Sequence, residues 1–117
     1  MPVKVYYLDD EIDLLSVFTD TFESSNVQVS TFDDPEKAIH AVNTTPPDIF
    51  FIDYRLPTMT GIDVALRIQV DIPIVLLTAD SNVANDPQTK ILFKAIFAKP
   101  FPVAEMEKFI ETHTNKV

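Results

Sequence analysis

Cysteine is absent from the 117-residue chain, and this absence excludes disulfide bonds and metal sites built on thiolates. Such a composition fits a reducing cytoplasm. Long apolar runs are also missing, and no segment approaches the ~20 apolar residues that a membrane-spanning helix requires. The N-terminal residues Met1 to Lys4 lack the basic and then apolar order of a secretory signal. We therefore expect a cytoplasmic protein that does not span a membrane.

Basic residues are scarce, because 9 Lys and Arg stand against 18 Asp and Glu, which gives a net charge of −9. Phosphate backbones would be repelled by this charge, so we expect no direct nucleic-acid binding by these residues. Hydrophobic residues make up 46% of the chain, which is enough for one core at this length. With no repeat and no linker-like segment, we expect a single domain over residues 1–117. A DNA-binding output domain would have to lie outside these residues.

Strand-like and helix-like segments alternate along the chain. The predicted strands are residues 3–8, 27–32, 48–53, 72–78 and 95–98. The third and fourth of them are continuous apolar runs, which are typical of strands buried on both faces of a parallel sheet. The predicted helices are residues 12–24, a short segment from Pro35 to before Pro46, 61–70, 87–93 and 103–113. Five strands alternating with five helices predict an α/β fold with helices on both faces of a parallel sheet.

Polar residues follow or end four of the five predicted strands. They are Asp9 and Asp10 after the first strand, Asp53 at the end of the third, Thr78 at the end of the fourth and Lys99 after the fifth. In a doubly wound sheet the functional crevice lies beyond the carboxyl ends of the strands, so we expect these side chains at one edge. A lone loop aspartate is usually a solvated turn residue, and Asp10 alone could be a helix cap. Asp53 differs because it ends a buried strand, where an unpartnered carboxylate is costly.

Three clustered carboxylates need a cation, because like charges raise each other's pKa when no cation is near. Mg²⁺ fits this need, since it prefers oxygen ligands and retains several waters. With the metal bound, an aspartate can attack phosphorus and become an aspartyl phosphate. The metal and Lys99 would neutralise charge on the transferring phosphoryl oxygens, and Thr78 could donate its hydroxyl to the product. The cluster is therefore chemically complete for accepting a phosphoryl group.

The motifs around these residues resemble the receiver domains of two-component response regulators. The resemblance is carried by Asp9-Asp10, residues 51–57 (FIDYRLP), Met59-Thr60-Gly61, Leu77-Thr78-Ala79 and Lys99-Pro100-Phe101. These motifs cover nearly the whole chain in the family's order and spacing. The resemblance implies a flavodoxin-like (βα)5 doubly wound fold, with five parallel strands in the order 2-1-3-4-5.

The same resemblance implies a role for each residue of the cluster. Asp53 would be the phosphoacceptor, and Thr78 and Lys99 would pair with the phosphoryl group. The implied ligands of Mg²⁺ are the side chains of Asp10 and Asp53, the backbone carbonyl of Arg55 and, mainly through bound water, Asp9. A sensor histidine kinase or a histidine phosphotransfer protein would donate the phosphoryl group. The chain would then be a self-phosphorylating phosphorelay acceptor rather than an enzyme, with at most slow autodephosphorylation.

Two departures from the family pattern concern switching and partner binding. The family couples its threonine to an aromatic residue three positions before the lysine, a position held here by Ile96, and we expect Phe97 on the opposite face. The family's partner or homodimer face comprises the fourth helix, fifth strand and fifth helix. Here residues 91–93 (ILF) make it unusually apolar, and we expect most of them to be core, since an exposed cluster would mark a binding site. The Lys99-Pro100 bond is expected to be cis, as is usual in the family.

Arg55 and Asp80 flank the expected site, two residues after Asp53 and Thr78. We hypothesise that they pair across it and hinder the water that would hydrolyse an aspartyl phosphate. The alternative is two independent surface charges.

Two other functions stay open: a receiver fold that only binds partners, and a phosphatase with an aspartate nucleophile. The phosphatase would need an acid at position 55, where an arginine cannot transfer protons.

Overall fold

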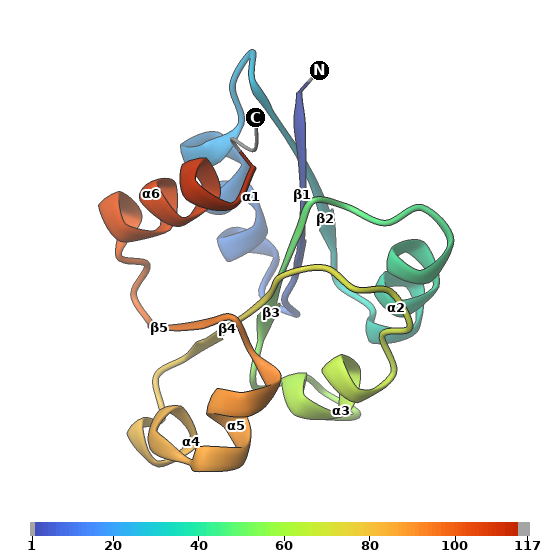
Figure 1. Ribbon diagram of the computed structural model, residues 1–117, viewed down its shortest axis with the longest axis vertical. Helices are drawn as coiled ribbons and strands as arrows, with labels where there is room; N and C mark the ends of the chain where they lie inside the picture. Colours follow the sequence, from blue (N-terminus) through green and yellow to red (C-terminus); the bar gives the residue numbers. More distant parts are fainter. Residues whose placement is uncertain (1, 115–117) are drawn as a thin grey trace.

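The computed structural model describes residues 2–114 as a parallel sheet between two layers of helices (Figure 1). The strands are β1 (Val3–Leu8), β2 (Val27–Phe32), β3 (Ile49–Asp53), β4 (Ile74–Thr78) and β5 (Ala95–Ala98). The helices are α1 (Ile12–Phe22), α2 (Pro35–Thr44), α3 (Gly61–Leu66), α4 (Ser81–Asn85), α5 (Pro87–Leu92) and α6 (Val103–Thr114). None of the helices in this described part combines the length and apolarity needed to cross a membrane.

All five strands are parallel and follow the order β2-β1-β3-β4-β5, which confirms the predicted order. The register places Leu8 beside Ile52 and Asp53 beside Leu77. The carboxyl ends of β1, β3 and β4 therefore stop at nearly the same level. The sheet thus brings the loops after these strands to one edge, where a doubly wound fold holds its functional crevice.

The core is split by the sheet into two halves. Every residue of β3 and β4 is buried, because helices cover both faces, as the apolar runs predicted. On one face α1 and α6 cover alternate strand residues such as Tyr7 and Phe51, and on the other α2, α3 and α5 cover Leu8 and Ile52 (Figure 1). Each fully buried large apolar side chain contributes roughly 1.5–3 kcal/mol. The two half-cores together hold the sheet edge rigid.

Helix number and helix length differ from the sequence prediction. The described residues form six helices rather than five, because Ser81–Asn85 is a separate turn of helix. It lacks an apolar period and forms on its cap, since Asp80 accepts from the backbone N–H groups of Asn82 and Val83 at 2.9 and 3.4 Å. Helix α3 ends at Leu66 rather than at residue 70, because the chain tightens there: the Arg67 N–H donates to the carbonyl of Val64.

Candidate functional site

The three acidic residues expected at the sheet edge meet there. One carboxylate oxygen from each of Asp9, Asp10 and Asp53 lies within 4.8 Å of the other two. Asp9 is fully buried, Asp53 is nearly so, and Asp10 is exposed. Helix α1 begins with Glu11 as its N-cap residue, so the alternative that Asp10 caps this helix is wrong. The described residues thus offer three oxygen donors, the ligand type that a hard divalent ion such as Mg²⁺ prefers.

Lys99 joins this cluster from the loop after β5. Its Nζ lies 2.6 Å from Asp53 Oδ1 and 3.0 Å from Asp9 Oδ2, and its side chain is 16% exposed. The Lys99-Pro100 bond is cis, as predicted. The Lys99 backbone N–H donates to the carbonyl of Thr78 at 3.3 Å, which ties the loop to β4. One ammonium is therefore shared between two buried carboxylates.

Burial dominates the electrostatics of Asp53. It raises the pKa of this carboxyl to about 6, against the hydrogen bond from Lys99, which lowers it, and with the nearby charge of Asp9, which raises it further. For Lys99, burial alone would lower the pKa, but the hydrogen bonds to Asp53 and Asp9 outweigh burial and raise the pKa above its ordinary value. Lys99 therefore stays charged at neutral pH, and Asp53 is mostly ionised above about pH 6.

Asp9 is held by three hydrogen-bond donors, none of which the sequence analysis had assigned to it. Its Oδ1 accepts from the Glu11 N–H at 3.0 Å, and its Oδ2 accepts from Lys99 Nζ and from the hydroxyl of Tyr7. Burial is the largest cause that raises the pKa of Tyr7 well above its ordinary value, followed by the hydrogen bond to Asp9. Tyr7 therefore remains a hydroxyl donor. The available signal was its position two residues before Asp9, on the same face of the strand.

Thr78 lies where the sequence predicted, at the buried end of β4. Its hydroxyl accepts from the backbone N–H of Asp80 at 3.0 Å, which shapes the start of the loop before α4. Asp53 pairs in register with Leu77, the residue before Thr78. The threonine is thus one position along the neighbouring strand from the acid cluster, and its hydroxyl is engaged with its own loop.

The loop after Asp53 is closed by a tight start to α3. Thr60 caps the helix: its hydroxyl accepts from the Asp63 N–H at 3.2 Å, and the Asp63 carboxylate accepts from the Thr60 N–H at 3.0 Å. Gly61, the single glycine of the chain, follows. A Cβ there would lie 2.8 Å from the Asp53 carbonyl oxygen and 2.9 Å from Leu76 Cδ1. Only glycine allows helix α3 to start this close to Asp53.

Arg55 and Asp80 form the ion pair that the sequence predicted across the mouth of the site. Arg55 Nη2 lies 3.6 Å from Asp80 Oδ2, and the side chains are 79% and 31% exposed. They link the loop after β3 to the loop after β4. Such an exposed pair contributes little to stability, so any effect on hydrolysis stays a prediction.

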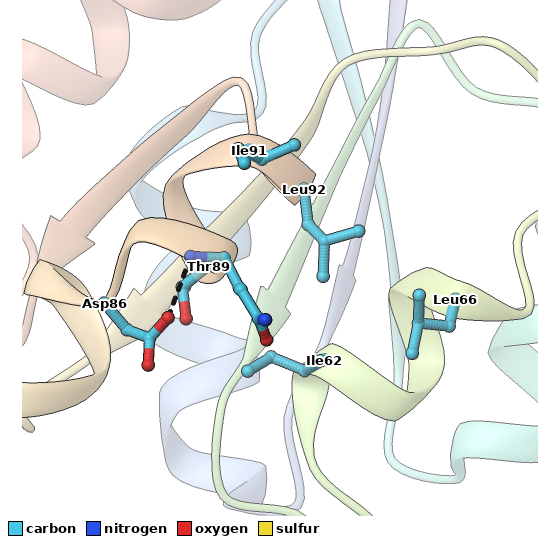
Figure 2. A pocket seen from close by; sticks show the side chains of 7 residues that line it. Ile62, Leu66, Asp86, Thr89, Ile91 and Leu92 are labelled. Atoms are coloured by element: carbon cyan, nitrogen blue, oxygen red, sulfur yellow. Dashed lines mark hydrogen bonds between the residues drawn. The ribbon is translucent and has the colours of Figure 1, made fainter.

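The expected partner face is only partly buried. Phe93 is core, Leu92 and Ile96 are half-buried, and Ile91 is 83% exposed. Figure 2 shows Leu92 of α5 pointing toward Ile62 and Leu66 of α3, and Ile91 also borders the apolar groove between the two helices. Ile96 packs in the half-core under α2, α3 and α5, whereas Phe97 packs in the other half-core. The prediction that these two neighbours point to opposite faces is confirmed.

Comparison with known proteins identifies the family. The chain matches the family described as response regulator receiver domain over residues 5–111. It is 31% identical over 87 residues to the DNA-binding response regulator MtrA of Mycobacterium tuberculosis, covering 73% of this chain and 38% of that protein. It is 32% identical over 82 residues to the alkaline phosphatase synthesis transcriptional regulatory protein PhoP of Bacillus subtilis, covering 68% and 34%. The chain thus spans well under half the length of these curated relatives.

These relatives qualify one sequence prediction. MtrA is described as DNA-binding, so an expectation of no nucleic-acid contact fails for such whole regulators. It is kept only for the residues of this chain, which cover a minor part of MtrA.

Solved structures of low sequence identity share the fold. The CheY-like receiver domain from Methylobacillus flagellatus has a TM-score of 0.87 at 19% identity, covering 97% of this chain and 99% of that one. The response regulator TrrA of Thermotoga maritima, solved in complex with Mg²⁺-BeF, has a TM-score of 0.85 at 21% identity, covering 95% and 98%. These structures show the fold, and the family match over residues 5–111 shows that the chain belongs to the response regulator receiver domain family.

Proposed function

We propose that Asp53 accepts a phosphoryl group in an Mg²⁺-dependent reaction, and that Asp9, Asp10 and Asp53 hold the metal together with the backbone carbonyl of Arg55. One observation carries the proposal: a nearly buried carboxylate ends β3 within an acidic cluster and bonds to Lys99 at 2.6 Å. The negative charge of these three carboxylates is only partly balanced by Lys99, so the cluster favours the binding of a divalent cation. The Mg²⁺-BeF complex of the related fold TrrA supports the same metal. The bound metal would supply charge neutralisation at the phosphoryl oxygens.

The transfer needs an ionised Asp53. One of its carboxylate oxygens forms a bond to phosphorus while the bond between phosphorus and a histidine nitrogen of the donor breaks, and the electron pair leaves with that nitrogen. Lys99, already 2.6 Å from Asp53 Oδ1, then pairs with the new phosphoryl oxygens. Thr78 would release the N–H of Asp80 and donate its hydroxyl to the same group. This rearrangement moves the loops after β3 and β4 and provides the conformational signal.

The donor would be a sensor histidine kinase or a histidine phosphotransfer protein. Asp53 is nearly buried, so the donor must press against the surface around the site. A groove there is lined by Lys99 and by apolar residues of α1, of the loop before α6 and of the start of α6, namely Leu14, Val17, Pro100, Phe101 and Val103. An apolar helix face carrying the phosphohistidine suits this groove. The cytoplasmic location that such an exchange implies rests on the family rather than on the fold.

The output partner belongs to the same proposal. The face formed by α5, β5 and α6 carries the exposed Ile91 and would bind an output partner or a second copy of the chain. Phosphorylation shifts the populations of two conformations only by its differential stabilisation of them. Sedimentation analysis of the chain before and after phosphorylation tests the homodimer, and an unchanged monomer would leave a heterologous partner.

Incubation with acetyl phosphate and Mg²⁺, followed by intact-mass measurement, tests the acceptor. The wild type is expected to gain one phosphoryl group, and Asp53→Asn is expected to gain none. Asp48→Asn is the matched control, because Asp48 directly precedes β3 and its carboxylate accepts from the Lys4 N–H at 2.8 Å, at the other end of the strand. No gain in the wild type would favour a receiver fold that only binds partners. Turnover of phosphate esters would favour the phosphatase.

A further inference from the structure

Tyr7 brings a neutral hydroxyl to the buried side of the acidic cluster. It is the second-last residue of β1, is fully buried, and donates its hydroxyl hydrogen to Asp9 Oδ2. Side chains two residues apart along a strand share a face, so the ring of Tyr7 fills the core while its hydroxyl reaches Asp9. A phenylalanine would fill the core almost equally well. The hydroxyl is therefore the feature that needs an explanation.

The ring of Tyr7 is fixed by its aromatic neighbours. It stacks on Phe18 of α1, with ring centroids 4.4 Å apart, and meets the edge of Phe101 at 5.9 Å. Phe101 follows the cis Lys99-Pro100 bond, so the same ring that carries the hydroxyl also supports the loop that carries Lys99. Stacked and edge-on contacts of this kind restrict ring movement. The hydroxyl is thus held at a fixed place relative to both Asp9 and Lys99.

Asp9 and Asp53 compete for one cation. Lys99 Nζ lies 3.0 Å from Asp9 Oδ2 and 2.6 Å from Asp53 Oδ1. A buried carboxylate that lacks donors is strongly disfavoured, so a less well satisfied Asp9 would draw Lys99 toward itself. The Tyr7 hydroxyl supplies a second side-chain donor to Asp9 Oδ2. This hydrogen bond partly satisfies the Asp9 carboxylate, so Asp9 attracts Lys99 less strongly, and the hydroxyl adds no charge of its own.

We propose that Tyr7 is a positioning residue, whose hydroxyl holds Asp9 in place and thereby keeps Lys99 available to Asp53. Without the hydroxyl, Lys99 moves toward Asp9, and Asp53 is less well neutralised. Asp9 also loses its fixed orientation beside Asp10, so the three oxygens are less well arranged for a cation. The positioning is a property of the metal-free protein, and its consequence for phosphoryl transfer rests on the proposed function of Asp53.

Tyr7→Phe removes the hydroxyl and keeps the ring. Its matched control is Tyr6→Phe. Tyr6 is the preceding residue of β1, and its hydroxyl donates to the Thr45 carbonyl at 2.9 Å, away from the site. We expect the NMR signal of the Lys99 ammonium in the metal-free protein to shift in Tyr7→Phe and to stay unchanged in Tyr6→Phe. We expect the Kd for Mg²⁺, measured by calorimetry, to rise by roughly threefold to tenfold in Tyr7→Phe, the effect of losing about one hydrogen bond.

Phe18→Leu distinguishes the positioning role of Tyr7 from a purely structural role. Phe18→Leu weakens one of the two aromatic contacts but keeps the hydroxyl, its bond to Asp9 and the contact of the ring with Phe101. It is therefore expected to lower the melting temperature while changing the Kd for Mg²⁺ by less than about twofold. The proposal is wrong if Tyr7→Phe leaves the Lys99 signal unmoved, or if Phe18→Leu weakens Mg²⁺ binding as much as Tyr7→Phe does. Acetyl phosphate labelling of the wild type tests the proposed function of Asp53 separately from the role of Tyr7. A wild type that takes no phosphoryl group refutes the function of Asp53, whereas the Lys99 signal still decides the role of Tyr7.

Discussion

The ammonium of Lys99 lies 2.6 Å from Asp53 Oδ1, which joins the loop after β5 to the end of β3. Asp53 is nearly buried, and Lys99 offsets part of the penalty for an ionised carboxylate there, although burial still raises the pKa of Asp53 to about 6. Asp9 draws on the same ammonium. Charge at this sheet edge is therefore incompletely balanced in the metal-free protein, and removing either partner of the pair has a measurable effect on stability.

Removal of the lysine charge should destabilise the metal-free protein. In Lys99→Met, two buried carboxylates lose their shared cation, and breaking such a pair costs about 3 kcal/mol or more. Saturating Mg²⁺ should recover much of the loss, because a ligand at a hundredfold excess over its Kd stabilises the folded state by about 2.7 kcal/mol. Urea unfolding with and without Mg²⁺ measures both effects. Lys90→Met, at an exposed position of α5, should not destabilise the metal-free protein, and Mg²⁺ should stabilise it as much as it stabilises the wild type.

Removing the negative charge of Asp53 should have the opposite effect and stabilise the metal-free protein. The pKa of Asp53 is raised from the ordinary 3.8 to about 6 in the folded chain, so the folded state binds this proton more tightly. The ionised carboxylate therefore destabilises the fold fully above about pH 6, and the penalty disappears as the pH falls from 6 toward 3.8. Asp53→Asn should stabilise the metal-free protein at pH 7.5 by roughly 1–3 kcal/mol.

The pH dependence separates this electrostatic effect from a packing effect. The difference in unfolding free energy between Asp53→Asn and the wild type should shrink steadily from pH 7 to pH 4, because the protonated carboxyl resembles the amide. Asp48→Asn, at an exposed position, should show no such trend. A stabilisation by Asp53→Asn that is constant over this range would contradict the burial-driven shift in the pKa of Asp53.

Most of the site could be predicted because it depends on strand ends. Apolar runs such as residues 49–52 mark a strand buried on both faces, and a parallel sheet then brings Asp53, Thr78 and Lys99 to the same edge. No side-chain geometry is needed for that inference. The acidic cluster, the nearby lysine and the Arg55–Asp80 pair all follow from residues placed at or just beyond these ends, whereas the sharing of Lys99 between Asp9 and Asp53 does not.

The features that were missed depend on contacts between particular atoms. Strand alternation places Tyr7 and Asp9 on one face, but it does not show that the hydroxyl of Tyr7 reaches Asp9 Oδ2. Residues 81–85 lack an apolar period, and they become helical because the Asp80 side chain caps their N–H groups. The early end of α3 at Leu66 likewise results from local backbone bonds. Sequence periodicity reports burial, and none of these features is a burial pattern.

Adding one methyl group at Gly61 should destabilise the fold. The Cβ of alanine would lie 2.8 Å from the Asp53 carbonyl oxygen and 2.9 Å from Leu76 Cδ1, and the first of these contacts is to backbone that cannot rotate away. Overpacking of this kind costs about 1–3 kcal/mol, although alanine normally favours a helix over glycine by roughly 0.5–1 kcal/mol. Urea unfolding of Gly61→Ala measures the sum. Gln88→Ala, at an exposed helical position, is the control and should be nearly neutral.

The pairing of Arg55 with Asp80 should slow loss of the phosphoryl group. The pair spans the loops after β3 and β4 at 3.6 Å, and Arg55 is two residues after Asp53, so we expect the pair to restrict the approach of water to an aspartyl phosphate. Arg55→Gln and Asp80→Asn should each raise the autodephosphorylation rate by about threefold to tenfold, which corresponds to roughly 0.6–1.4 kcal/mol in the barrier. Asparagine is preferred to alanine at position 80 because its side-chain oxygen can still cap α4.

The double variant decides whether the two charges act together. If they hinder water as a pair, Arg55→Gln combined with Asp80→Asn should lose its phosphoryl group no faster than the faster single variant. If the rate increases of the two single variants multiply in the double variant, Arg55 and Asp80 are two independent surface charges. Thermal unfolding of all three variants serves as the control: an exposed ion pair contributes less than about 1 kcal/mol, so their melting temperatures should stay close to that of the wild type. Decay of the phosphorylated mass after removal of acetyl phosphate gives the rates directly.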